Sequence, residues 1–115
     1  MRMGTEILLD EVSLNKLVHD RWWFDVDETV FDAERQEFRI YAGLRRKGPY
    51  NQRLLRVTGV HDIVIDDQAK IGIYSIHDIQ IATRLISIRS SYPLRISLTI
   101  PGDARIFISD LTESD

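Results

Sequence analysis

The sequence predicts an all-β protein: a single antiparallel β-sandwich or barrel of roughly seven to nine short strands with one short N-terminal helix. Three observations carry this prediction. Apolar and polar residues alternate with a period of two along most of the chain after residue 22. Turn-forming residues recur about every 8–12 residues, a spacing typical of sandwiches and barrels. Strands do not alternate with helical segments, so a parallel nucleotide-binding sheet is not expected.

The one expected helix lies within the first 20 residues. Ser13 is its expected N-cap, because a serine hydroxyl can accept a hydrogen bond from a backbone N–H in the first turn. Apolar side chains then follow at helical spacing, at Leu14, Leu17 and Val18. The helix is expected to end at His19-Asp20, after about two turns.

The expected strands cover residues 29–31, 37–44, 54–58, 60–66, 73–82, 85–90, 94–100 and 105–109. The segment 94–100 alternates most regularly between aliphatic and polar residues, which indicates a half-buried strand. Gly59 indicates a bulge or bend between two of the strands. The turns between strands are polar or contain Gly and Pro, at 32–36, 45–52, 67–70, 90–93 and 101–103.

Length and composition fit one soluble domain. The chain of 115 residues is expected to form a single domain over 1–115, with frayed ends at 1–4 and 111–115. It has no cysteine, which excludes disulfides and thiolate metal sites and is consistent with the cytoplasm. The N-terminal segment is unlike a signal peptide, and no apolar run approaches the ~20 residues that span a bilayer.

Sequence patterns of common enzymes are missing. There is no P-loop, dinucleotide-binding or nucleophile-elbow pattern. We therefore expect no cofactor and name no catalytic residue.

All three histidines precede an aspartate, at His19, His61 and His77. Alternation places His61 and His77 at the leading ends of isoleucine rows, where an imidazole suits the boundary between core and water. Each aspartate then points to the opposite face of its strand. The repeat is therefore interpreted as a product of strand architecture.

A metal site is the alternative interpretation of two of these histidines. If 60–66 and 72–78 form a hairpin that is symmetric about Ala69, His61 lies opposite His77 with Cβ atoms about 5 Å apart. A slip of one residue, which Gly72 favours, would break this pairing. Zinc also needs three or four ligands, and the sequence does not bring His19 near. A metal-dependent enzyme that uses His61 and His77 is the third functional hypothesis.

The segment RWWFDVDE, residues 21–28, is a candidate protein-binding patch. In a strand, Trp22 and Phe24 face one way and Trp23 the other. An exposed Trp23 beside Asp25, Asp27 and Glu28 would suit a basic protein partner. The alternative is that the N-terminal helix covers Trp23.

The segment RRKGPYNQR, residues 45–53, is a candidate phosphate-binding loop. Its basic residues could contact phosphates and its tyrosine could stack on a base, with Arg45, Arg46, Lys47, Tyr50 and Arg53 as the candidates. The alternative is a solvated hairpin loop. The net charge of −3 and the single aromatic residue in the loop place nucleic-acid binding second.

The run His19-Asp20-Arg21-Trp22-Trp23, followed by the strands within 29–44, resembles small uncharacterised bacterial all-β domains, some of which are classed as immunity proteins of toxin systems. The resemblance implies a non-catalytic binder that blocks a toxin, for example a basic nuclease, by covering its surface. The leading hypothesis is therefore a protein-interaction module. A homodimer formed by pairing of strand edges is a further possibility.

Overall fold

A computed structural model gives the fold and describes residues 7–8, 10–90, 93–102 and 104–111. The elements in chain order are β1 (Ile7–Leu8), α1 (Glu11–Val18), β2 (Trp23–Asp25), η1 (Val26–Glu28), β3 (Val30–Asp32), β4 (Glu37–Gly43), β5 (Arg53–Thr58), β6 (Asp62–Asp67), β7 (Ile73–Ile81), β8 (Leu85–Ser90), β9 (Leu94–Thr99) and β10 (Arg105–Asp110). The strands pair antiparallel. The predicted all-β fold with one short N-terminal helix is confirmed.

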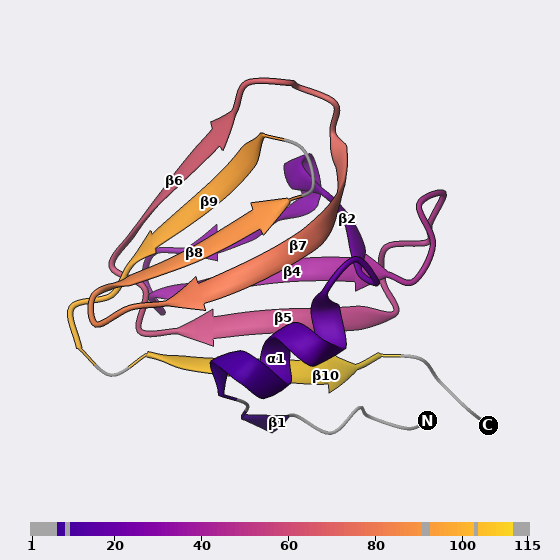
Figure 1. The fold of residues 1–115 in the computed structure, drawn as a ribbon. Helices are drawn as coiled ribbons and strands as arrows, with labels where there is room; N and C mark the ends of the chain where they lie inside the picture. Colours follow the sequence, from indigo (N-terminus) through magenta and orange to yellow (C-terminus); the bar gives the residue numbers. More distant parts are fainter. Residues whose placement is uncertain (1–6, 9, 91–92, 103, 112–115) are drawn as a thin grey trace.

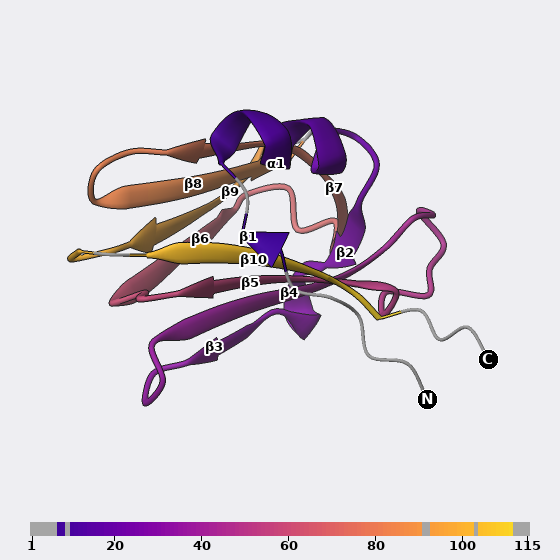
Figure 2. The ribbon, with the colours of Figure 1, turned by 90° about the horizontal axis from the view of Figure 1, so that it is seen from below.

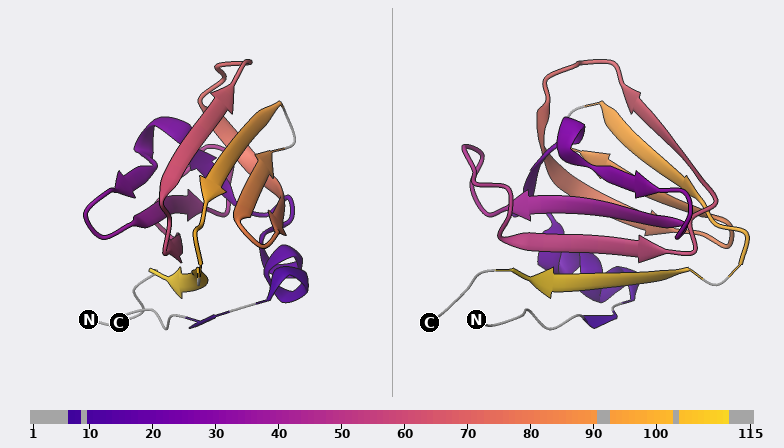
Figure 3. Two further views of the ribbon diagram at one scale, coloured as in Figure 1. Left: turned by 90° about the vertical axis from the view of Figure 1, so that its left-hand side faces the viewer. Right: turned by 180° about the vertical axis from the view of Figure 1, so that it is seen from behind.

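The strands form one continuous sheet that folds into two layers (Figure 1). The order is β1-β10-β5-β4-β2-β7-β8-β9-β6, with β3 beside β4. Strand β2 links the layers, because it pairs with β4 on one side and with β7 on the other. The strands of the β6–β9–β8–β7 layer cross those of the other layer obliquely (Figure 3). Residues 19–28 therefore lie at the junction of the layers.

Helix α1 lies alongside β7 (Figure 2). Leu14 and Val18 are buried, and the Asn15 side-chain amide exchanges two hydrogen bonds with the backbone of Ile79, both 2.8 Å. Among the described residues, no helix has the length and apolar character needed to cross a membrane.

The predicted Ser13 cap is wrong. Asp10 caps the helix instead, and its carboxylate accepts a hydrogen bond from the Ser13 N–H at 2.7 Å. A carboxylate also interacts favourably with the positive N-terminal end of the helix dipole, which favours Asp10 over a neutral hydroxyl. This hydrogen bond holds the pKa of Asp10 below its ordinary value.

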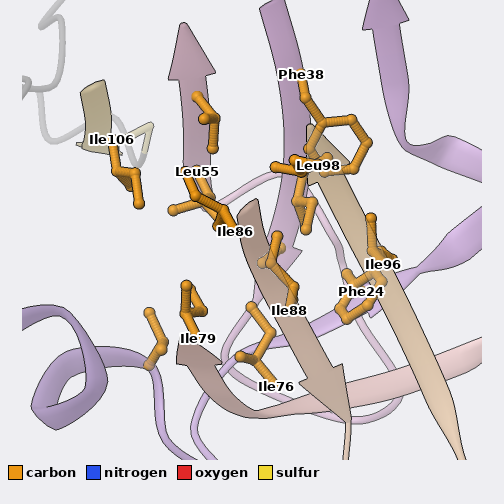
Figure 4. Close-up of a cluster of buried hydrophobic side chains, with 14 of the residues drawn as sticks. Phe24, Phe38, Leu55, Ile76, Ile79, Ile86, Ile88, Ile96, Leu98 and Ile106 are labelled. Atoms are coloured by element: carbon orange, nitrogen blue, oxygen red, sulfur yellow. The ribbon is translucent and has the colours of Figure 1, made fainter. Parts of the chain in front are cut away.

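The core fills the space between the two layers (Figure 4). Alternation on β9 is as predicted, since Leu94, Ile96 and Leu98 are buried while Arg95 and Thr99 are exposed. The largest fully buried side chains come from both layers and from α1: Tyr74, Phe24, Phe38, Leu14, Ile40, Leu55, Ile76, Ile79, Ile86, Ile88, Ile96 and Leu98. Full burial of one such side chain contributes about 1.5–3 kcal/mol.

The segments 60–66 and 72–78 do not form the hairpin considered from the sequence. β6 pairs with β9, whereas β7 pairs with β2 and β8. The connection is held by the buried Tyr74, whose hydroxyl donates to the Asp67 carboxylate and accepts from the Ile71 N–H at 3.0 Å. Gly72 (φ 94°) accepts a hydrogen bond from the Val26 N–H at 2.9 Å, which directs the chain into pairing with β2.

The isoleucine row of 60–66 is less buried than predicted. Ile63 is half-buried, and Ile65 is exposed together with Val64 on the opposite face. β6 lies at the end of the sheet order, so it has one strand neighbour among the described residues. Homodimerisation through such an edge stays a prediction.

A charged network lies on β4 and β5. The carboxylate of Glu37, 6% exposed, accepts hydrogen bonds from the Arg39 guanidinium at 2.5 and 2.8 Å and from Arg56 at 2.6 Å. The Arg56 guanidinium also lies 4.7 Å from the centroid of the Phe107 ring. Burial alone would raise the pKa of Glu37, but the hydrogen bonds from Arg56 and Arg39 outweigh it and hold this pKa below its ordinary value.

Of the ends predicted to fray, 1–4 and 112–115 lie outside the described residues. Leu111 is described, and its N–H donates to the Gln52 carbonyl at 2.9 Å. The chain is therefore hydrogen-bonded to the 45–53 loop at this point.

Candidate functional site

The loop between β4 and β5 is anchored at its base by Gln52. The Gln52 N–H donates to the Ala42 carbonyl at 3.0 Å, and its side-chain oxygen accepts from the Leu44 N–H at 3.2 Å. At the tip, the Gly48 N–H donates to the Arg45 carbonyl at 3.0 Å. The Tyr50 hydroxyl donates to the Arg46 carbonyl. The loop thus has an internal structure of its own.

The loop folds back onto the end of β4 because residue 43 is glycine. A Cβ on Gly43 would lie 1.9 Å from the Pro49 carbonyl oxygen and 3.5 Å from the Tyr50 Cα. Gly43 is also the strand partner of Trp23 on β2. The loop and Trp23 are therefore brought together at one strand pair.

Trp23 is half-buried between buried Trp22 and Phe24, as the predicted alternation requires. The Arg46 guanidinium lies 6.0 Å from the centroid of the Trp23 ring. This distance is at the limit of a cation–π contact, which contributes about 0.5–1 kcal/mol at an exposed site. The two segments that the sequence offered as alternative sites thus form one continuous surface.

The acidic residues after Trp23 are divided between two places. Asp25 caps η1, and its carboxylate accepts a hydrogen bond from the Asp27 N–H at 3.0 Å. Asp25 and Glu28 line one hollow, whereas Asp27 lines another one beside Ile65 and Lys70. Of the predicted patch, Asp25 and Glu28 therefore share one hollow, whereas Asp27 lines a different one.

We call the first of these the acidic hollow; it has a volume of about 490 Å³ and is lined by Asp25, Glu28, Val30, Tyr41, Pro49, Tyr50 and Asn51. These residues come from β2, η1, β3, β4 and the 45–53 loop. Its polar groups are two carboxylates, two phenols and an amide, and none of the seven residues is basic. The two carboxylates of this lining attract a cation, and the Arg39 guanidinium lies beside the hollow, hydrogen-bonded to Tyr41.

The basic residues of the 45–53 loop do not converge on one phosphate. The Arg53 guanidinium donates to the Asp110 carboxylate at 3.0 Å and to the Gln52 carbonyl at 2.9 Å, whereas Arg46 lies over Trp23. Arg45 and Lys47 are exposed at the loop tip. Phosphate binding by this loop stays a prediction. Fewer of its basic side chains are available to contact one phosphate together than the sequence indicated.

The structure does not place His61 and His77 opposite each other. The His61 N–H donates to the Thr99 carbonyl at 2.7 Å, at the edge of the β6–β9 pair. His77, on β7, instead has His19 as its neighbour, with ring centroids 4.9 Å apart. The metal hypothesis in its His61–His77 form therefore lacks the hairpin on which it depends.

Sequence reasoning missed Val30, Tyr41, Pro49 and Asn51 as residues of the acidic hollow. A signal existed for Tyr41, because alternation along 37–44 placed it on the face opposite the core. No local sequence signal indicated that β3 and the 45–53 loop would meet beside Tyr41.

Comparison of the chain with models of known protein families, with curated proteins and with solved structures finds no match.

Proposed function

We propose that this protein is a non-catalytic protein-interaction module whose acidic hollow binds a basic side chain of a partner protein. One observation carries the proposal: Asp25 and Glu28 stand with the rings of Tyr41 and Tyr50 around a single hollow whose lining contains no basic residue. A lysine or arginine side chain could bury its aliphatic stem there while its charge meets the carboxylates.

The surroundings of the hollow favour a protein partner over a nucleic acid. Carboxylates in a binding surface repel phosphates, and Arg53 is already paired with Asp110. The neighbouring Trp23–Arg46 pair adds two residue types that are enriched at the energetic centres of protein interfaces. A volume of about 490 Å³ lies within the range of pockets that hold ligand groups.

The run His19-Asp20-Arg21-Trp22-Trp23 and the strands within 29–44 resemble small bacterial all-β domains, some of which are classed as immunity proteins of toxin systems. This resemblance extends the proposal to a class of partner. Such a partner would be a toxin with a basic surface, for example a nuclease, inhibited because this protein covers its surface. The acidic hollow supplies the charge complementarity that this role needs.

Affinity capture of the tagged protein from a lysate of its source cells, with and without nuclease treatment, tests the proposal. The wild-type protein is compared with Glu28→Lys, which reverses a charge in the acidic hollow, and with Glu34→Lys, which makes the same change in the exposed β3–β4 turn. We expect one protein at stoichiometric yield with wild type and Glu34→Lys, resistant to nuclease, and its loss with Glu28→Lys.

Two outcomes would contradict the proposal. Equal recovery with Glu28→Lys and Glu34→Lys would mean that the hollow does not contact the partner. Recovery that collapses on nuclease treatment would favour phosphate binding through Arg45 and Lys47.

A further inference from the structure

Two histidines and an aspartate from distant parts of the chain gather at the C-terminal end of α1. His19 Nε2 lies 3.2 Å from one carboxylate oxygen of Asp20, and His77 Nδ1 lies 3.7 Å from the other. One potential ligand atom from each of the three residues lies within 4.8 Å of the others. All three side chains are about half exposed, so a small solute can reach them.

Backbone hydrogen bonds hold these residues in place. His19 is the C-cap of α1, and the Asp20 N–H donates to the Ile76 carbonyl at 2.8 Å. The Ile76 N–H donates in turn to the Trp22 carbonyl at 2.9 Å. The register of β7 shifts between Ile76 and Asp78, so His77 lies at an irregularity of the kind that redirects a side chain.

A hydrogen bond to the backbone fixes the tautomer of His19. Its Nδ1 lies 2.5 Å from the His77 carbonyl oxygen, which can only accept, so this nitrogen carries the proton. In the neutral ring the lone pair of Nε2 then faces the Asp20 carboxylate. Two acceptors 3.2 Å apart repel each other unless a positive charge lies between them or on the ring.

We propose that His19 Nε2, the Asp20 carboxylate and His77 Nδ1 bind a divalent transition-metal ion of the zinc type. Tetrahedral coordination with bonds of about 2.0–2.1 Å places ligand atoms about 3.3–3.4 Å apart. The 3.2 and 3.7 Å distances run to different oxygens of Asp20, and one ligand atom from each of the three residues lies within 4.8 Å of the others. Rotation of the half-exposed side chains by about an ångström would bring these atoms to the tetrahedral spacing.

The donor set selects the class of metal. Two imidazoles with one carboxylate suit zinc and its neighbours, whereas Ca²⁺ and Mg²⁺ prefer oxygen ligands. Donation of the other ring N–H to a backbone carbonyl, as His19 does to His77, is the usual way in which proteins orient a metal-binding imidazole. Three protein ligands leave a fourth position for water.

The metal would connect the end of α1 to β7, because its ligands come from both segments. Binding to the folded state alone would raise thermal stability as the metal concentration rises above the dissociation constant, with the logarithm of that concentration. The site lies on other residues than the acidic hollow, so it can be tested independently of the proposed function.

Calorimetric titration of untagged, chelator-treated protein with zinc chloride tests the site. We expect one zinc ion per chain for wild type. Affinity should fall at least about tenfold for His19→Ala, His77→Ala and Asp20→Asn, because even an outer-shell partner of a metal ligand contributes that much. Asn retains the tolerance for a left-handed backbone that residue 20 needs at φ 54°.

The matched control is His61→Ala, which removes the third exposed histidine-aspartate pair and should leave zinc affinity unchanged. NMR of the imidazole protons is measured on the wild-type protein alone, so misfolding of a variant cannot affect the result. Zinc should shift the signals of His19 and His77 and leave those of His61 in place.

The proposal is overturned if wild type binds no zinc at submillimolar concentration, or if the imidazole signals of His19 and His77 do not move. It is also overturned if His61→Ala loses as much affinity as His77→Ala.

Discussion

The carbonyl oxygen of Pro49 lies 1.9 Å from the position that a Cβ on Gly43 would take. The 45–53 loop can therefore close over the end of β4 only while residue 43 has no side chain. This closure carries Pro49 and Tyr50 to Asp25 and Glu28, and so it forms the acidic hollow.

Gly43→Ala is expected to displace the loop. Overpacking of this kind costs about 1–3 kcal/mol, and the Arg46–Trp23 contact should be lost. Chemical denaturation would measure the lower stability, and Trp23 fluorescence would report the change at the ring. Gly102→Ala is the control, since a Cβ there meets no atom within 4 Å. Equal behaviour of the two variants would argue against the close approach.

Trp23→Ala is expected to abolish partner capture and to leave the fold intact. The ring is half-buried at the surface, so its loss should cost about 1–2 kcal/mol of unfolding free energy. Trp22→Ala, at a side chain only 2% exposed, should cost about 3–5 kcal/mol. Comparison of urea unfolding and partner capture for both variants checks the prediction, and a Trp23→Ala protein that retains its partner would contradict it.

Glu37→Gln is expected to destabilise the fold at neutral pH by about 1–3 kcal/mol, because it removes the charge that satisfies two arginines. The guanidinium groups of Arg39 and Arg56 would then lie beside a neutral amide in place of a carboxylate. Glu34→Gln in the exposed turn should have almost no effect. Urea denaturation of both variants measures the difference, and equal midpoints would show that the network contributes little.

The lowered pKa of Glu37 also predicts how the stability of the fold changes with pH. Because the folded-state pKa of Glu37 is lowered, its stabilisation is fully present above the unfolded value of about 4.3 and is lost as pH falls through the lower folded pKa. The stability difference between wild type and Glu37→Gln should therefore shrink when urea denaturation is repeated at falling pH below about 4. A difference that stays constant down to acid unfolding would refute this assignment.

Tyr74→Phe is expected to destabilise the β6–β7 connection. The variant leaves the Asp67 carboxylate and the Ile71 N–H without the phenol that they share, at a cost of about 1–3 kcal/mol. Amide hydrogen exchange should accelerate first in residues 67–72. Tyr41→Phe is a suitable comparison on the outer face of β4. If exchange at 67–72 is as slow in Tyr74→Phe as in Tyr41→Phe, the hydroxyl does not hold the connection.

Local periodicity was sufficient for the fold class. The alternation of Leu94, Ile96 and Leu98 with polar residues predicts both the strand and its buried face, because the side-chain period of a strand is two. The orientation of Trp22, Trp23 and Phe24 followed from the same rule. Such signals lie within a few residues of each other and need no knowledge of distant partners.

Long-range pairing was outside the reach of the sequence. Residues 60–66 and 72–78 are neighbours in the chain, yet β6 pairs with β9 and β7 with β2 and β8. His19 and His77 meet only because the end of α1 runs beside β7. The acidic hollow likewise depends on where the 45–53 loop folds. Gly43 allows the loop to lie over the end of β4, but a glycine at this position does not by itself predict that arrangement.

Hydrogen–deuterium exchange of the purified protein, alone and with its captured partner, tests the central claim most directly. The account predicts that partner binding slows exchange in residues 23–30 and 44–52, which surround the acidic hollow. It predicts no change along β6 (Asp62–Asp67). Slower exchange along β6 with no change at the hollow would contradict the account and would place the interface at the strand edge.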